Sequence, residues 1–203
     1  MRSRDASGGA PEKQVLSAAN RQRHLFPSSV SRDRRLIACT ETGGPSRGDI
    51  VVTPIAGGSP VAAIDTAFDE TNGILSPDGR LLAYQSDESG RWEIYLLRIA
   101  DQHRTAVSTA GGTSPIWSPD GRTLFYQAGS RLVSTGIDGV SRAIGAQLDV
   151  LALEDGAVTG IAPDGRILLR RHGEAASREA VLTLEWVREL RRILGPPETA
   201  LPR

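Results

Sequence analysis

The chain alternates short apolar stretches with brief polar interruptions rich in Gly, Pro, Asp and Ser. Stretches rich in Leu, Ile, Ala and Tyr follow similar polar phrases at 36–40, 81–86, 123–127 and 167–171. Behind each of them comes a second apolar stretch, at 49–55, 93–99, 131–137 and 180–186. Short runs of β-branched, aliphatic and aromatic residues bounded by turn formers are typical of strands. The pattern therefore predicts an all-β chain.

The polar phrase before each first stretch is itself repeated. It reads "SPDGR" at 76–80 and 118–122 and "APDGR" at 162–166, with a divergent copy, "SRDRR", at 31–35. Asp78 lies 45 positions after Asp33, Asp120 lies 42 positions after Asp78, and Asp164 lies 44 positions after Asp120. An even period of this length indicates a repeat architecture.

The conserved centre of the phrase has the chemistry of a tight turn. It occurs as Pro77-Asp78-Gly79, Pro119-Asp120-Gly121 and Pro163-Asp164-Gly165. Proline fixes φ at the first turn position, aspartate suits the next, and glycine takes a left-handed conformation at little cost. We expect these residues to be structural turns between the first two strands of each unit. A catalytic role of the three aspartates is the alternative, and three copies in three units argue against it.

Further short stretches complete each unit. In the first two units a third stretch follows, at 60–64 and 105–109, and a short strand at 72–75 or 114–117 precedes the next phrase. Four strands in about 40–45 residues is the size of a β-propeller blade. We therefore predict a β-propeller with four recognisable blades, although the strands between 144 and 159 are hard to place.

Two stretches carry a family resemblance, "SPDGRLLAYQSDESGRWEIYLLRI" at 76–99 and "STAGGTSPIWSPDGRTLFYQAGSRL" at 108–132. They resemble the TolB-like, WD-repeat-like family of bacterial β-propellers. Together with the chain end, "LTLEWVRELRRILGPP", they are similar to the propeller region at the C-terminus of bacterial receptor-like serine/threonine protein kinases. In that subset an "NW-x-x-EL" helix closes the chain. The matching positions here are Glu185, where the family tends to have Asn, and Trp186, Glu189 and Leu190.

The resemblance covers about 20–195 and implies a sensor or interaction propeller attached to another domain. Its ligand would be a protein or peptide, held on a propeller face or in the channel. TolB-like propellers usually close with six or more blades, so four blades predict a fragment, with a small propeller or a partly open and covered one as alternatives.

No enzyme is expected in this chain. It lacks the glycine-rich loop, "HRD" and "DFG" of a kinase, and it lacks the Gly-x-Ser-x-Gly of a hydrolase. A competing interpretation is the gating propeller of a prolyl-oligopeptidase-type hydrolase whose catalytic domain lies elsewhere. A stand-alone TolB-like partner protein is a third.

Charge and ligand chemistry narrow the picture further. The 24 basic and 24 acidic residues cancel, so no global field favours nucleic acid or an anionic membrane. Cys39 is the single cysteine, which excludes an intrachain disulfide. The histidines are far apart, at 24, 103 and 172, and no calcium-loop pattern is present. We therefore expect no metal and no cofactor, and we interpret the acidic pairs Asp69-Glu70 and Asp87-Glu88 as solvated loop charges.

The N-terminal segment 1–14 is polar and lacks the apolar core of a secretory signal, so we expect a disordered leader. No apolar run approaches the roughly 20 residues that span a bilayer. If 1–203 is the whole chain we expect a cytoplasmic protein, and an extracytoplasmic one if it is the sensor region of a membrane kinase.

Three aromatic residues are candidate interaction residues. Trp92 and Tyr95 follow the hairpin at 87–90, where packing between blades is the alternative role. Trp186 belongs to a predicted helix over 185–194, which either caps the last blade or docks a partner. The "RGD" at 47–49 has the sequence of an adhesion motif, but we expect it to arise by chance.

Overall fold

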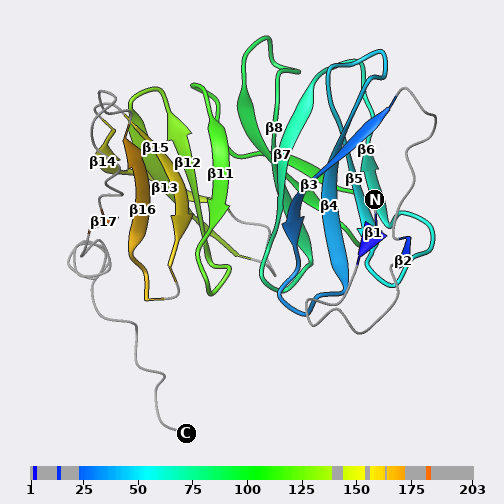
Figure 1. Cartoon of the computed structure of the whole chain (residues 1–203). Coiled ribbons are helices and arrows are strands. Elements are labelled where there is room, and N and C mark those ends of the chain that lie inside the picture. The colour runs from blue at the N-terminus through cyan, green and yellow to red at the C-terminus, as the bar shows by residue number, and fades with distance from the viewer. Residues whose placement is uncertain are drawn as a thin grey trace, which may run out of the picture.

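The structure is a computed structural model that describes residues 2–3, 13–14, 23–138, 144–153, 156–162, 164–171 and 182–183. All secondary structure in these ranges is β, and the strands pair with their sequence neighbours in antiparallel fashion. Figure 1 shows the main sheets standing next to one another in chain order. The prediction of an all-β fold is confirmed.

Three sheets have four strands each, and we call them blades 1 to 3. Blade 1 is β3 (His24–Val30), β4 (Leu36–Thr42), β5 (Asp49–Pro54) and β6 (Ala62–Ile64). Blade 2 is β7 (Glu70–Leu75), β8 (Leu81–Ser86), β9 (Glu93–Arg98) and β10 (Arg104–Ala106). Blade 3 is β11 (Thr113–Trp117), β12 (Thr123–Ala128), β13 (Arg131–Ile137) and β14 (Ile144–Ala152). The four-stranded repeat predicted from the sequence is present in each.

Blade 4 has three strands within the described residues, β15 (Gly156–Ile161), β16 (Ile167–Arg171) and β17 (Leu182–Thr183). The region that was hard to interpret in the sequence is thereby assigned: β14 closes blade 3 and β15 opens blade 4. A separate pair, β1 (Arg2–Ser3) and β2 (Lys13–Gln14), lies within the predicted leader. The predicted C-terminal helix and Trp186 lie outside the described residues.

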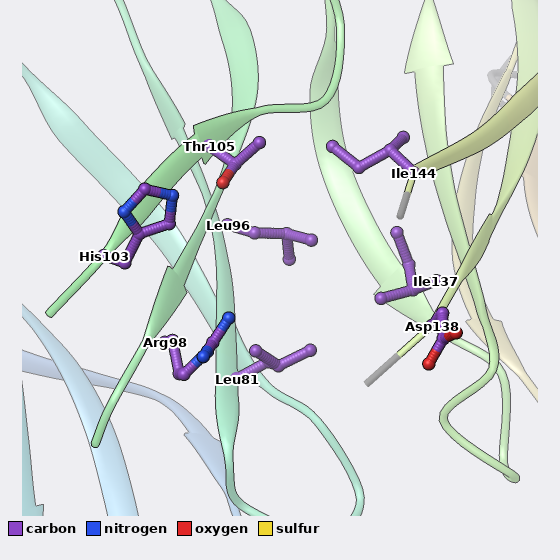
Figure 2. A pocket seen from close by; sticks show the side chains of 8 residues that line it. All are labelled: Leu81, Leu96, Arg98, His103, Thr105, Ile137, Asp138 and Ile144. Atoms are coloured by element: carbon purple, nitrogen blue, oxygen red, sulfur yellow. The ribbon is translucent and has the colours of Figure 1, made fainter. Parts of the chain in front are cut away.

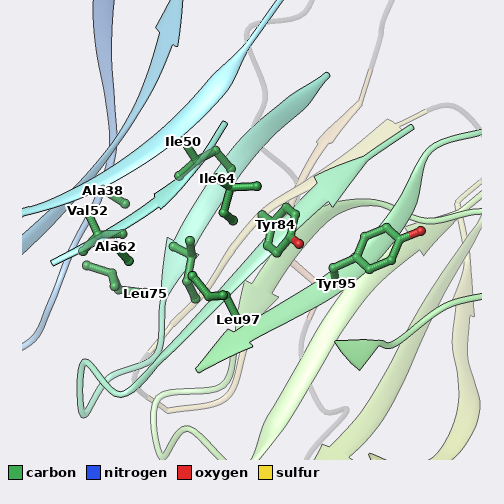
Figure 3. Close-up of a cluster of buried hydrophobic side chains, with 10 residues drawn as sticks. Ala38, Ile50, Val52, Ala62, Ile64, Leu75, Tyr84, Tyr95 and Leu97 are labelled. Atoms are coloured by element: carbon green, nitrogen blue, oxygen red, sulfur yellow. The ribbon is translucent and has the colours of Figure 1, made fainter. Parts of the chain in front are cut away.

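The core is divided among the contacts between successive blades. One cluster joins the facing sides of blades 1 and 2, including Val52, Ile64 and Leu97 (Figure 3). A second joins blades 2 and 3, and a third joins blades 3 and 4. Each sheet thus buries apolar side chains against its neighbour, which explains why the strands alternate between apolar and polar positions less strictly than in a one-sided sheet.

The first strand of each blade lies beside the first strand of the next. β3 contacts β7, β7 contacts β11, and β11 contacts β15. β3, β7 and β11 lie toward the middle of the molecule in Figure 1. These four first strands form what we call the inner wall.

Candidate functional site

The repeated phrase forms the same turn in three blades. In blade 2 the Ser76 hydroxyl donates to Asp78 Oδ1 at 2.6 Å and accepts from Leu81 N at 2.9 Å, while Gly79 N donates to Ser76 O at 2.8 Å. Ser31 and Ser118 make the equivalent bonds in blades 1 and 3. The serine that opens the phrase is therefore part of the turn, in addition to the proline, aspartate and glycine expected from the sequence. In blade 4 an alanine, Ala162, stands in its place.

The glycine of each phrase has a left-handed backbone, with φ of +70° at Gly79, +71° at Gly121 and +86° at Gly165. In the divergent copy Arg34 adopts φ of +60°, so the turn persists there without glycine. A Cβ added to Gly121 would lie 3.1 Å from Pro77 Cδ, in the phrase of the preceding blade. Successive turns are therefore packed against one another.

The aspartates of the phrase accept hydrogen bonds from the backbone of their own turn. Asp78, Asp120 and Asp164 each accept a hydrogen bond at Oδ1 from the backbone N–H two residues later, at 3.0–3.2 Å. Burial raises the pKa of Asp120, but the hydrogen bonds from Ser118 and from the Arg122 backbone outweigh it, and the net pKa is lowered. Such an acceptor is a poor general base, and this geometry favours the structural role over the catalytic one.

The aromatic candidates differ in accessibility. Tyr95 is 6% exposed, and its ring stacks on that of Tyr84 with centroids 5.7 Å apart (Figure 3). Its position in the core between blades 1 and 2 favours packing over partner contact. Trp92 is half-buried. Trp117, on blade 3, is 6% exposed and donates from Nε1 to Ile74 O of blade 2 at 3.0 Å, so it ties two blades together.

The "RGD" tripeptide is not presented as an adhesion loop. Asp49 is 4% exposed, accepts a hydrogen bond from Ser46 Oγ, and lies 3.5 Å from Arg23 NH1. Arg47 is exposed but pairs with Asp69 through both its backbone N–H and its guanidinium. The two charges that a receptor would need are therefore engaged within the chain.

Two buried acids lie at the strand ends opposite the repeated turns. Glu93 is 2% exposed, accepts hydrogen bonds from Ser108 Oγ and from Gly111 N at 2.9 Å, and forms an ion pair with Arg91, whose Nε lies 3.1 Å from Glu93 Oε1. Glu70 is fully buried, and Thr66 Oγ1 donates to its Oε1 at 2.5 Å. Among the described residues Glu70 Oε2 has no hydrogen-bond partner, and burial raises the pKa of this carboxyl. The expectation of solvated loop charges is therefore wrong for Asp69 and Glu70: Asp69 is 7% exposed and pairs with Arg47, and Glu70 opens β7 with its carboxyl fully buried.

These acids do not form a metal centre. No group of three or more His, Cys, Asp or Glu side chains with suitable geometry occurs within the part of the chain that the structure describes. Nor does any helix in those residues have the length and hydropathy to span a membrane.

The inner wall carries the most distinctive geometry in the molecule. In every blade the pairing between the first and second strands shifts register, between Pro27 and Ser29, Thr71 and Ile74, Thr113 and Ile116, and Val158 and Gly160. A small polar residue lies at each shift, and we call these four residues the bulge row: Ser28, Asn72, Ser114 and Thr159. β-Bulges re-aim side chains and are frequent beside functional sites.

Two members of the bulge row have strained backbones. Asn72 and Ser114 both have φ of 53°, a left-handed conformation that is uncommon outside glycine. Gln85 holds both in place: its Oε1 accepts from Asn72 Nδ2 at 2.9 Å and from the Ser114 backbone N at 3.0 Å. Ser28 Oγ similarly bridges to Gly73 O of the next blade at 2.7 Å. The row therefore spans the contacts between blades.

Side chains of the row remain available to a ligand. Ser28, Asn72 and Thr159 are exposed and Ser114 is half-buried. All four are uncharged: the hydroxyls of Ser28 and Thr159 donate to the carbonyls of Gly73 and Leu168 and offer acceptor oxygens, and the Asn72 amide has a second N–H and a carbonyl oxygen besides its bond to Gln85. The sequence held one signal for this site, the nearly constant placement of these residues five or six positions before the aspartate of each phrase. A repeat position occupied by Ser, Asn, Ser and Thr is easily taken for an ordinary strand residue.

Comparison with known proteins identifies the architecture. No protein-family profile and no curated protein sequence matches the chain. Among solved structures, TolB from Acinetobacter baumannii superposes with a TM-score of 0.59 at 17% identity, over 87% of this chain and 44% of that one. The fold is a β-propeller. The propeller domain of the Trilobed protease from Pyrococcus furiosus gives a TM-score of 0.55 at 18% identity, over 78% of this chain and 52% of that domain. A prolyl endopeptidase gives a TM-score of 0.56 at 15% identity, over 79% of this chain and 27% of that one.

These similarities establish the fold. TolB and peptidase propellers are both among the neighbours, so the TolB-like interpretation of the repeats is supported at the level of architecture. The chain covers about half of the length of TolB and of the Trilobed protease propeller domain.

Proposed function

We propose that this propeller is a non-catalytic interaction module that holds an extended protein or peptide segment against its inner wall. The bulge row is the observation that supports the proposal most strongly. It places uncharged donors and acceptors on four neighbouring first strands, two of them in strained conformations that the fold maintains. Hydroxyl and amide groups arranged in this way suit the alternating N–H and C=O groups of an extended backbone.

The type of protein to which this propeller belongs is a separate question. The sequence resemblance supports a receptor-like serine/threonine kinase, whereas the structural similarity to a protease propeller domain and a prolyl endopeptidase supports a gating propeller of a peptidase. The extended reading frame distinguishes them: kinase motifs upstream support the first, and Gly-x-Ser-x-Gly downstream supports the second.

The binding proposal can be tested by panning a random peptide display library on the immobilised chain. Selected peptides should bind the wild type and lose about tenfold or more in affinity on Asn72→Gly, because one hydrogen-bonding side chain is removed. Glycine tolerates the left-handed conformation at position 72, so this variant keeps the local backbone.

Ser89→Gly is the matched control, since it removes an exposed polar side chain from the β8–β9 hairpin. Binding should be unchanged in this variant. Failure to enrich any peptide, or equal affinity for the wild type and Asn72→Gly, would overturn the proposal.

A further inference from the structure

A small pocket lies in the contact between blades 2 and 3, and we call it the seam pocket. Figure 2 shows its lining, in which side chains from β8, β9 and β10 face side chains from β13 and β14 across the gap. Its floor is aliphatic, made by Leu81, Leu96, Ile137 and Ile144. These residues belong to the apolar cluster that joins the two blades. The pocket is therefore an accessible extension of the core.

Polar groups stand at the rim of this apolar floor. They are Arg98, His103 and Thr105 on blade 2 and Asp138 on blade 3. The Arg98 side chain is 24% exposed, and its Nη1 lies 3.2 Å from Asp101 Oδ2. A guanidinium has five N–H donors, so this one contact leaves donors that can bind a second carboxylate. Figure 2 shows the Arg98 side chain beside Leu81 and Leu96.

The size of the pocket limits what can fill it. Its volume of about 30 Å³ would hold about two water molecules or the end of one branched aliphatic chain. Ordered water needs several polar partners, whereas the floor offers aliphatic carbon, so an apolar guest is the better match. Arg98 then lies where the polar end of such a guest would emerge.

We propose that the seam pocket binds a branched aliphatic group that ends in a carboxylate, with the alkyl part on the Leu96–Ile137 floor and the carboxylate on Arg98. This chemistry can come from a C-terminal leucine of a peptide or from a free short-chain fatty acid. The seam pocket does not involve the inner wall, so this proposal is independent of the function proposed above.

The test is a titration of the ¹⁵N-labelled 203-residue chain, followed by NMR, with 4-methylpentanoate, with its amide, and with acetyl-Gly-Gly-Leu in free-acid and amide forms. We expect shifts at the amides of Leu81, Leu96 and Ile137 on adding a carboxylate. A greater affinity for the tripeptide acid than for 4-methylpentanoate identifies a C-terminal residue as the ligand, and the reverse order identifies a free acid.

Substitutions distinguish the contribution of Arg98 from that of the aliphatic floor. Arg98→Gln should weaken binding by about tenfold or more, the effect of losing a charge-assisted hydrogen bond. Arg80→Gln is the matched control, because this exposed arginine lies at the β7–β8 turn and does not line the pocket. The affinity of this variant for the carboxylate ligands should equal that of the wild type.

Filling the pocket is the second approach. Leu96→Phe should abolish binding, and if that variant does not fold, Thr105→Phe places the bulk at the half-buried rim instead. Three results would overturn the proposal. They are the absence of shifts at the backbone amides of the seam pocket at millimolar ligand, equal affinity for the amide and free-acid forms of the ligands, and equal affinity of the Arg98→Gln variant and the wild type for the acids.

Discussion

At the scale of single residues, Glu70 is the most unusual group in the propeller. A fully buried carboxyl with one unpartnered oxygen is costly when ionised, because burial removes water that the two hydroxyl donors, Thr66 and Ser86, replace only on Oε1. This explains why the pKa of Glu70 lies above its ordinary value. An acid whose pKa is raised by folding stabilises the folded state when protonated, and this stabilisation is lost as the pH rises through the raised pKa.

Glu70→Gln should therefore gain stability relative to the wild type as the pH increases. Glutamine keeps an acceptor for Thr66 and Ser86 but cannot ionise. Chemical denaturation from about pH 4 to about pH 8 measures the difference in unfolding free energy, which should widen in favour of the variant across this range. Glu88→Gln, on the neighbouring loop, reports the effect of losing one partly exposed negative charge. A difference that is constant with pH, or that narrows, would contradict the account of Glu70.

At the scale of elements, the repeated turn ends each first strand, and the bulge interrupts the pairing of that strand with the second strand. The turn was predictable because its chemistry is local: proline, aspartate and glycine each have a strong conformational preference within a few residues. The bulge was not, because Asn72 and Ser114 depend on Gln85, which lies on another strand and serves two blades. Because contacts distant in the sequence impose this left-handed backbone, the residue types at positions 72 and 114 do not predict it.

Gly121→Val tests the turn between β11 and β12. Valine at φ of +71° is strained, and its Cβ would lie 3.1 Å from Pro77 Cδ, so we expect a loss of about 1–2 kcal/mol or more in unfolding free energy. Gly136→Val on β13 is the matched control. A Cβ there meets nothing within 4 Å, and its backbone is not left-handed, so thermal denaturation should show little change. Equal stability of the two variants would refute the turn assignment.

At the scale of the whole molecule, the sequence period specified the architecture more completely than it specified the site. Even spacing of the phrase predicted blades, and contacts such as the Trp117–Ile74 hydrogen bond join one blade to the next. Glu70 and the bulge row were missed because they depend on tertiary contacts: folding buries the Glu70 carboxyl, and Gln85 links Asn72 to Ser114 of the next blade. The stacking of Tyr95 on Tyr84 follows from the register of the β8–β9 hairpin, which pairs the two residues directly, and the packing of blade 1 against this pair then buries Tyr95.

The central claim is that ligand recognition takes place on the inner wall. Hydrogen–deuterium exchange of the 203-residue chain, with and without the strongest peptide selected by panning, measures this directly. The account predicts slower exchange on ligand binding in β3, β7, β11 and β15, with no change in the outer strand β10. Protection confined to β10 or to the turns of the repeated phrase, with the first strands unaffected, would contradict it.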